Sequence, residues 1–168
     1  MKGQSPYPGT PDGTLPEAFH GKFFDVPSSY IEPKPFQKPH PPIYLAAYAP
    51  GSMQRVATMA DGWMPAGIPL EPMGQMMEGI RGMARQAGRD PAELKLVVRA
   101  NFNVTGQPLG DGRGIFYGSP DEIKSDIKAT KALGADELCF DPTFSSDGGS
   151  LEGFLKTMEQ MKKLAAEA

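Results

Sequence analysis

The chain has 168 residues, of which 39% are hydrophobic and 22% charged, with a formal net charge of −3. This length allows one domain with a substantial core, but it is too short for a complete barrel of eight βα units. Lys and Arg alternate with Asp and Glu instead of forming a basic stripe, which argues against nucleic acid as a partner. No segment resembles a membrane span or a signal peptide, and the single cysteine, Cys139, favours a reducing compartment such as the cytoplasm.

Residues 1–42 are rich in proline, as in "SPYPGTPDGTLP" and "IEPKPFQKPHPP". Proline lacks a backbone donor and disfavours helix, so this segment is predicted to be an arm that packs on another surface. Within the arm, "HGKFFDV" is compatible with a short strand or with one leg of a hairpin. The two histidines, His20 and His40, have no carboxylate or cysteine at ligand spacing, so no metal site is predicted.

From Ile43 onward, strand patterns alternate with helix patterns. Residues 43–48 ("IYLAAY") predict a buried strand, residues 52–60 a short helix, and residues 62–66 ("GWMPA") a second strand. The short helix should direct Val56, Met59 and Ala60 toward the core. The next helix is predicted to end before Gly88, and its apolar face comprises Met73, Met76, Met77, Ile80, Met83, Ala84 and Ala87.

The pattern continues with the longest predicted strand, residues 94–104. Ser119, Pro120 and Glu122 then provide an N-cap, an N1 proline and a capping box for a helix that runs through Leu133 and ends at Gly134. Residues 137–141 ("ELCFD") predict the fourth strand. The last helix should run from Ser150 to about Ala166, and its apolar face comprises Leu151, Phe154, Leu155, Met158, Met161 and Leu164.

Four consecutive βα units predict an α/β fold with a parallel sheet, equivalent to half of an eight-unit barrel. The expected organisation is a partial TIM barrel over residues 43–168, preceded by the arm of residues 1–42. An unfinished sheet has two open edges, and open edges promote association unless they are covered. We therefore expect a homodimer or a complementing chain, with the arm helping to cover the interface.

A helix start at the end of a parallel strand is a potential anion site. Its free N–H groups and partial positive charge face the ligand side of such sheets. Pro50, Gly51 and Ser52 suit this use, because Gly51 allows close backbone approach and Ser52 has a hydroxyl group. The small residues Ala46 and Ala47 leave room there. Alternatively, Gly51 and Ser52 simply begin the helix.

The strand at 94–104 has two distinct sides. Leu94, Leu96, Val98, Ala100 and Phe102 should face the helices, and the interior side comprises Lys95, Val97, Arg99, Asn101 and Asn103. Polar groups on the interior side need partners, either a ligand or water and a neighbouring carboxylate. Asp141 is a candidate partner for Arg99, a pocket acid, or a turn residue before Pro142. The glycine-rich segment 106–114 ("GQPLGDGRG") lacks the lysine of a Walker loop and is predicted to be a mobile connection or lid.

Taken in order, "FHGKFFDV", "PKPFQKPHPPIYLAA", "VATMADGWMP", "AGRDPAEL" and "FYGSPDEIKSDIKATKALGADELCFDPTF" resemble the C-terminal half of the bacterial luciferase-like monooxygenase family. The flavin- and F420-dependent oxidoreductases of that family are the nearest match. The resemblance implies a TIM barrel that binds FMN or F420 at its C-terminal face and performs hydride transfer or oxygen activation on a small organic substrate. It places the cofactor phosphate on Ala47, Tyr48, Ala49, Pro50, Gly51 and Ser52.

The resemblance also bears on residues outside the phosphate loop. Asp61, Gly62 and Trp63 belong to the family pattern, either as a turn with Trp63 packed in the barrel wall or as a cofactor contact. Substrate or pocket residues are predicted to be Arg99, Asn101, Asn103 and Asp141, and no catalytic residue is predicted. The family's other half carries the cradle for the cofactor ring, so the alternative function is a non-catalytic flavin-binding chain or partner subunit.

Overall fold

The computed structural model describes residues 18–28, 33, 35–145 and 149–168. Two compact units make up the chain, Met1–Pro41 and Pro42–Ala168, and each is described by itself. In the first unit, strands β1 (Phe19–His20) and β2 (Asp25–Val26) pair antiparallel, so "HGKFFDV" forms a small hairpin. His20 Nδ1 lies 2.5 Å from Asp25 Oδ1 across this hairpin.

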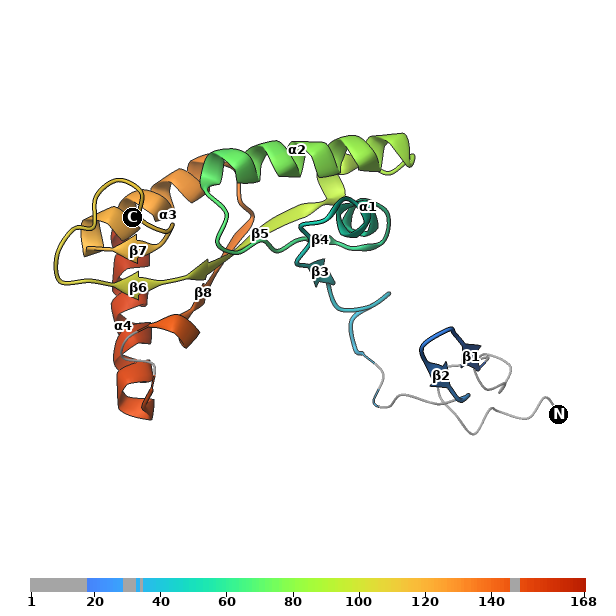
Figure 1. Ribbon diagram of the computed structural model, residues 1–168, viewed down its shortest axis with the longest axis horizontal. Helices are drawn as coiled ribbons and strands as arrows, with labels where there is room; N and C mark the ends of the chain where they lie inside the picture. Colours follow the sequence, from blue (N-terminus) through green and yellow to red (C-terminus); the bar gives the residue numbers. More distant parts are fainter. Residues whose placement is uncertain (1–17, 29–32, 34, 146–148) are drawn as a thin grey trace. The chain divides into compact units, whose positions relative to one another are not determined.

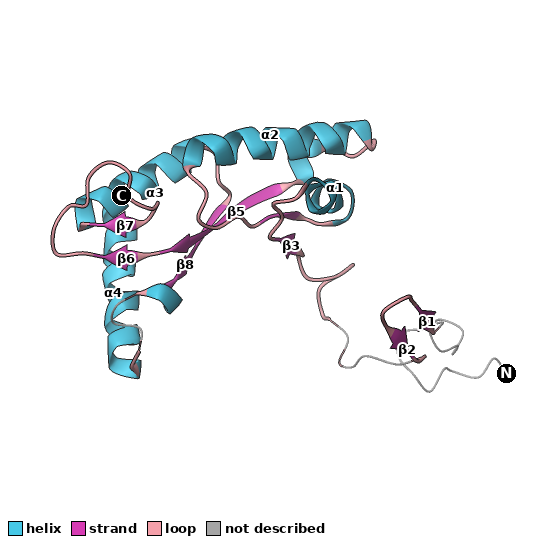
Figure 2. Cartoon of the chain, in the orientation of Figure 1, coloured by secondary structure: helices cyan, strands magenta, loops and turns pink. Residues whose placement is uncertain are grey.

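The second unit is built on a four-stranded sheet in the order β3-β4-β5-β8, and every neighbouring pair is parallel. The strands are β3 (Tyr44–Leu45), β4 (Gly62–Trp63), β5 (Lys95–Asn101) and β8 (Glu137–Asp141). Because spatial order follows chain order, each strand is followed by a helical crossover to its neighbour, as predicted for consecutive βα units. Figures 1 and 2 show this alternation along the chain.

Four helices connect and follow these strands: α1 (Pro50–Met59), α2 (Leu70–Gln86), α3 (Pro120–Ala132) and α4 (Leu151–Glu167). Short 3-10 turns, η1 (Pro91–Glu93) and η2 (Pro142–Phe144), precede β5 and follow β8. A separate pair of short parallel strands, β6 (Asn103–Val104) and β7 (Tyr117–Gly118), frames the connection to α3. Within the described ranges, no helix has the length and apolarity needed to cross a bilayer.

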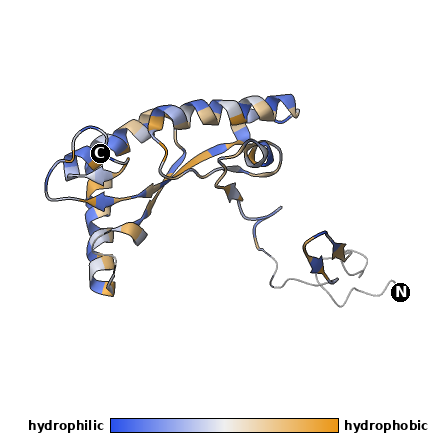
Figure 3. Ribbon diagram, in the orientation of Figure 1, coloured by the Kyte–Doolittle hydropathy of each residue, from blue (hydrophilic) through white to orange (hydrophobic). Residues whose placement is uncertain are grey.

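The core lies between one side of β5 and the helices. Leu96, Val98, Ala100 and Phe102 are at most 2% exposed and pack in one cluster with residues of α1, α2 and α3. The alternation of side chains along this strand predicted that the same side would face the helices, and this prediction is confirmed. Figure 3 shows the apolar stretch of β5 beneath α2. The Phe102 and Phe140 rings meet edge to face at 5.9 Å, which joins β8 to the same core.

β4 approaches β5 very closely at Gly62. A Cβ atom at this position would lie 2.4 Å from the Lys95 carbonyl oxygen, a distance that no side chain tolerates. The neighbouring Trp63 is fully buried, and its Nε1 donates a hydrogen bond to the Ala47 carbonyl at 2.9 Å. Trp63 therefore packs in the sheet wall, the first of the two alternatives for the Asp61-Gly62-Trp63 unit.

Three predicted strands are shorter in the structure, and the one predicted over 62–66 forms a strand only at Gly62 and Trp63. The strand predicted over 43–48 pairs only at Tyr44 and Leu45, because the next donor on the β4 side, the Ala66 N–H, bonds the Tyr48 hydroxyl instead. The strand predicted over 94–104 breaks at Phe102. Beyond it, the Asn103 N–H donates to the Phe116 carbonyl, so the chain leaves the main sheet for the pair of β6 and β7.

The predicted helix caps and glycine ends are confirmed, but one predicted side-chain orientation is not. The Ser119 hydroxyl caps α3, Glu122 completes the capping box, and Gly134 follows with a φ of 84°. Gly88 likewise follows α2 with a φ of 78°. The prediction that Met59 faces the core was wrong, since its side chain is 74% exposed and Ala57 is buried instead.

Helix α1 also begins two residues earlier than predicted. Pro50 occupies its first position, which suits a residue without an N–H, and Ala49 is its N-cap.

Candidate functional site

The predicted phosphate loop lies where β3 ends and α1 begins. Ala49, Pro50 and Gly51 are exposed, and a Cβ atom placed on Gly51 would meet no atom within 4 Å. Open space beside the first turn of a helix is what an anion requires in order to reach the backbone. The structure thus keeps this helix start accessible.

The donors of this helix start are partly used. The Ser52 and Met53 N–H groups both donate to the Ala49 carbonyl at 3.0 Å, and Pro50 has no N–H. The Ser52 hydroxyl accepts from the Ala49 N–H at 3.1 Å and donates to the Ala49 carbonyl at 2.8 Å. Among described residues the Gly51 N–H has no partner, so it is the donor that can bind an anion without breaking another hydrogen bond. Ser52 occupies the third helical position and is not the N-cap.

Two hydrogen bonds fix the strand end that carries this loop. The Tyr48 hydroxyl accepts from the Ala66 N–H at 3.1 Å and donates to the Ala66 carbonyl at 3.3 Å. Ala47 is 1% exposed, and its carbonyl accepts from Trp63. The loop is therefore held by the hydrogen bond between Ala47 and Trp63 and by the two bonds between Tyr48 and Ala66, just beyond β4.

A charged pair lies on the interior side of β5 and β8. Arg99 Nε donates to Asp141 Oδ2 at 2.7 Å, and a second guanidinium nitrogen reaches the same oxygen. Asp141 Oδ1 accepts from the Thr143 hydroxyl at 2.5 Å and from the Thr143 N–H at 2.9 Å. The Thr143 hydroxyl, with Arg99 as a further contributor, lowers the pKa of Asp141 below its usual range. Asp141 is thus both the partner of Arg99 and the cap of the turn that follows β8.

Asn101 is the polar residue of this group whose hydrogen bonding is incomplete. It pairs in register with Asp141 on the same side of the sheet as Arg99, and its side-chain oxygen is buried without a partner among the described residues. A buried acceptor of this kind calls for a donor from outside these strands. Asn103 is not part of the group, because it belongs to β6 in a separate sheet.

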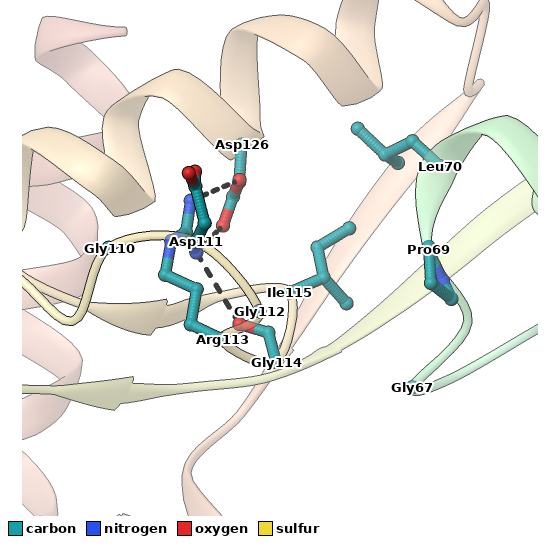
Figure 4. Close-up of a pocket in the computed structure, with 10 residues that line it drawn as sticks. All are labelled: Gly67, Pro69, Leu70, Gly110, Asp111, Gly112, Arg113, Gly114, Ile115 and Asp126. Atoms are coloured by element: carbon teal, nitrogen blue, oxygen red, sulfur yellow. Dashed lines mark hydrogen bonds and ion pairs between the residues drawn. The ribbon is translucent and has the colours of Figure 1, made fainter.

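The densest polar network was not predicted from the sequence. Arg113 donates to both oxygens of Asp126, at 2.6 and 2.8 Å, and Asp126 also accepts from the Phe116 N–H at 2.8 Å. Arg113 and Asp126 border a pocket of about 340 Å³ between the start of α2, the 110–115 loop and α3 (Figure 4). The only sequence signal was the four-residue spacing of Glu122 and Asp126, which places both carboxylates on one side of α3.

Glu122 fastens the same loop to the start of α3. Its carboxylate accepts from the Ser119 N–H at 2.7 Å, the Gly110 N–H at 2.8 Å and the Leu109 N–H at 3.1 Å. The glycine-rich segment is therefore tied at several points, which argues against a freely moving lid. Gly118 makes the arrangement possible, because its φ is 143° and a Cβ there would lie 2.4 Å from Glu122 Oε2.

These bonds predict an acid-sensitive contribution to stability. The Ser119 and Gly110 N–H groups hold the pKa of Glu122 at about 2, against 4.5 for a free carboxyl. Folded Glu122 thus binds its proton more weakly than unfolded Glu122, so its contribution is complete above about pH 4.5 and is lost as the pH falls toward 2. In urea unfolding at stepped pH, the variant Glu122→Gln should lose less stability than the wild type over this window. The exposed-site control Glu159→Gln should follow the wild-type curve, and two parallel curves for wild type and Glu122→Gln would contradict the assignment.

The comparisons with known proteins agree with this architecture. The family model for luciferase-like monooxygenases matches residues 13–108, more than half of the chain. An uncharacterized protein of Mycobacterium tuberculosis is 29% identical over 98 residues, which are 58% of this chain and 33% of that protein. The chain belongs to the luciferase-like monooxygenase family.

Solved structures show the same fold. A coenzyme F420-dependent tetrahydromethanopterin reductase from Methanopyrus kandleri matches with a TM-score of 0.61 at 15% identity, over 89% of this chain and 57% of that one. A long-chain alkane monooxygenase matches with a TM-score of 0.58 at 18% identity, over 89% and 46%. The chain therefore spans about half the length of these structures, and its four βα units form part of a TIM barrel.

Proposed function

We propose that this chain anchors the phosphate of FMN or F420 at the start of α1 and serves an oxidoreductase or monooxygenase acting on a small organic substrate in the cytoplasm. The observation that carries the proposal is the open helix start at the carboxyl end of β3. Gly51 offers an N–H without a partner among the described residues, in space that a phosphate can occupy. Helix dipole and donor then both favour a negative charge.

The interior side of β5 and β8 supports the same proposal. Arg99, Asn101 and Asp141 lie together on that side, and the buried Asn101 oxygen has no partner among the described residues. A substrate or cofactor with a hydrogen-bond donor satisfies this oxygen. When bound, the flavin or deazaflavin supplies the hydride chemistry, whereas this chain's residues bind and orient it.

A specific observation favours a second candidate, a non-catalytic flavin-binding chain or partner subunit. Arg99 and Asp141 are joined to each other, and Thr143 occupies the other Asp141 oxygen. The Thr143 hydroxyl and Arg99 lower the pKa of Asp141 further below the range of a useful proton donor, which makes the group a poor general acid. Under this candidate the chain binds the cofactor without turnover.

The proposal is tested by titrating the purified chain with FMN and with F420 and following cofactor fluorescence. Saturable binding of one of them is expected. In the variant Gly51→Asp, binding should weaken about tenfold or more, because the added carboxylate repels the phosphate. An acidic residue in the first turn favours the helix itself, so weaker binding should not come from unfolding.

The matched control is Gly79→Asp, which adds the same charge at an exposed glycine of α2 with no atom within 4 Å of its Cβ position. Binding by this variant should equal that of the wild type. Equal weakening by both variants, or no saturable binding of either cofactor, would refute the anchor. Binding without turnover in the presence of reductant and candidate substrates would favour the second candidate.

A further inference from the structure

The first half of α4 exposes a row of apolar side chains. The exposed fractions are 76% for Leu151, 41% for Phe154, 55% for Leu155 and 38% for Met158. At helical spacing these residues lie directly beside the buried stripe of Met161 and Leu164. Figure 1 shows the first turns of α4 extending away from α3. We call these four residues the α4 row.

The sheet is open on the same side of the unit. Among described residues, β8 pairs with β5 alone, so its other edge presents unbonded backbone groups. Cys139 is exposed on this strand, in register with Arg99 and hence on the interior side. A pocket of about 200 Å³ also lies along α3 and β8, and its lining includes Ile127, Ala135 and Leu138. An open edge flanked by apolar surface favours association.

The opposite end of the sheet shows the complementary features. β3 pairs only with β4 within the described residues, which leaves its outer edge open. Beside this edge, Ile43 is 47% exposed, and Met59 on α1 is 74% exposed. One end therefore offers a parallel edge followed by the apolar helix α4, whereas within the described residues no helix comes before β3 at the other end.

We propose that a second copy of this chain covers both ends, with β8 of each protomer beside β3 of the other and the α4 row against α1 of the other. Two sets of four parallel strands give the eight strands of the barrel to which this fold belongs. A two-fold axis makes both junctions identical, so both outer edges of the four-stranded sheet in each protomer are paired at once. The helix order α4 then α1 would repeat the packing of α1 on α2 within one protomer.

The complementarity of the two ends of the sheet favours a second copy of this chain as the partner. Any other partner must supply a parallel edge for β8, another for β3, and an apolar helix for the α4 row. This chain carries all three surfaces. In the dimer, β8 of each protomer meets β3 of the other, and each α4 row meets α1 of the other. The interior Arg99 and Asn101 would then face a closed space shared by both protomers. Dimerisation requires no cofactor, so its failure and the failure of cofactor anchoring are separate results.

Sedimentation equilibrium of the full chain tests the proposal. The wild type should have twice the 18.1 kDa mass of one chain. The variant Leu155→Asp should raise the dimer dissociation constant by at least about tenfold, because it buries an unpaired carboxylate in an apolar contact. Leu155 is more than half exposed in the protomer, so the variant should remain folded by circular dichroism. The control Lys163→Asp places aspartate on the charged side of the same helix and should leave the dimer intact.

The single cysteine supplies a second readout. Cys139 should react with a thiol reagent slowly in the concentrated wild type and faster on dilution or in Leu155→Asp, because the closed interior shields it. A wild type that stays monomeric at all concentrations would overturn the proposal and assign the α4 row to another chain. Equal effects of Leu155→Asp and Lys163→Asp, or a thiol reactivity independent of concentration, would also overturn it. Gly51→Asp should change cofactor binding and leave the dimer unchanged.

Discussion

Replacing Trp63 by alanine should lower the free energy of unfolding by about 3–5 kcal/mol, the range for removing a large aromatic side chain from a core. The indole is fully buried and belongs to the main core cluster between the sheet and the helices. The change also strips the Ala47 carbonyl of its hydrogen-bond donor. Urea unfolding followed by far-ultraviolet circular dichroism measures the loss, because the variant has no tryptophan fluorescence.

The variant Trp63→Phe separates packing from hydrogen bonding. It keeps most of the apolar volume and loses the Nε1 donor, so its loss should be clearly smaller than that of Trp63→Ala. Because the donor supports Ala47, Trp63→Phe should also weaken cofactor binding at the start of α1. A loss for Trp63→Ala below about 1 kcal/mol would show that the wall around Trp63 is not a packed core.

Replacing Asp126 by alanine should lower the free energy of unfolding by about 2–3 kcal/mol. Breaking a buried pair by removing one partner costs more than this, but the side chains of Arg113 and Asp126 remain 17% and 14% exposed, so solvent screens part of the penalty. The Phe116 N–H also loses its acceptor. Hydrogen exchange of residues 105–118 should accelerate, because Asp126 holds this segment against α3.

The matched control is Asp121→Ala on the same helix. Asp121 pairs with Lys124 at 2.8 Å, but its side chain is 89% exposed, and a pair of this kind contributes little. Its stability and its exchange in 105–118 should match the wild type. Unchanged exchange in Asp126→Ala would mean that Glu122 alone fastens the loop.

Local signals in the sequence predicted the parts of the fold that depend on local chemistry. The α3 helix was placed correctly because Ser119, Pro120 and Glu122 act within one turn, and Gly134 ends it by its own backbone conformation. The lengths of β3 and β5 depend instead on distant partners. The Tyr48 hydroxyl takes the donor that would extend β3, and Phe116 draws the chain away from β5.

The candidate site likewise has one part that could be predicted from the sequence and one part that could not. The pairing of Arg99 with Asp141 was predictable, since strand alternation and the carboxyl ends of parallel strands restrict both positions. The contact between Arg113 and Asp126 was not, because a glycine-rich loop has no periodicity to orient its arginine. Apolar periodicity likewise identified the face of α4 but carries no information on what covers it. Leu155 and Met158 belong to that predicted face, and they are exposed in the structure.

Gly118 limits how this region of the protein can be altered. Because the Glu122 carboxylate occupies the volume of a side chain at position 118, the helix cap and the preceding loop share one acceptor. Residues 106–108 lie between β6 and these contacts, so insertions and loop grafts should be tolerated there. Residues 109–122 are joined through the Glu122 carboxylate, so this segment would have to be replaced as one unit in protein engineering.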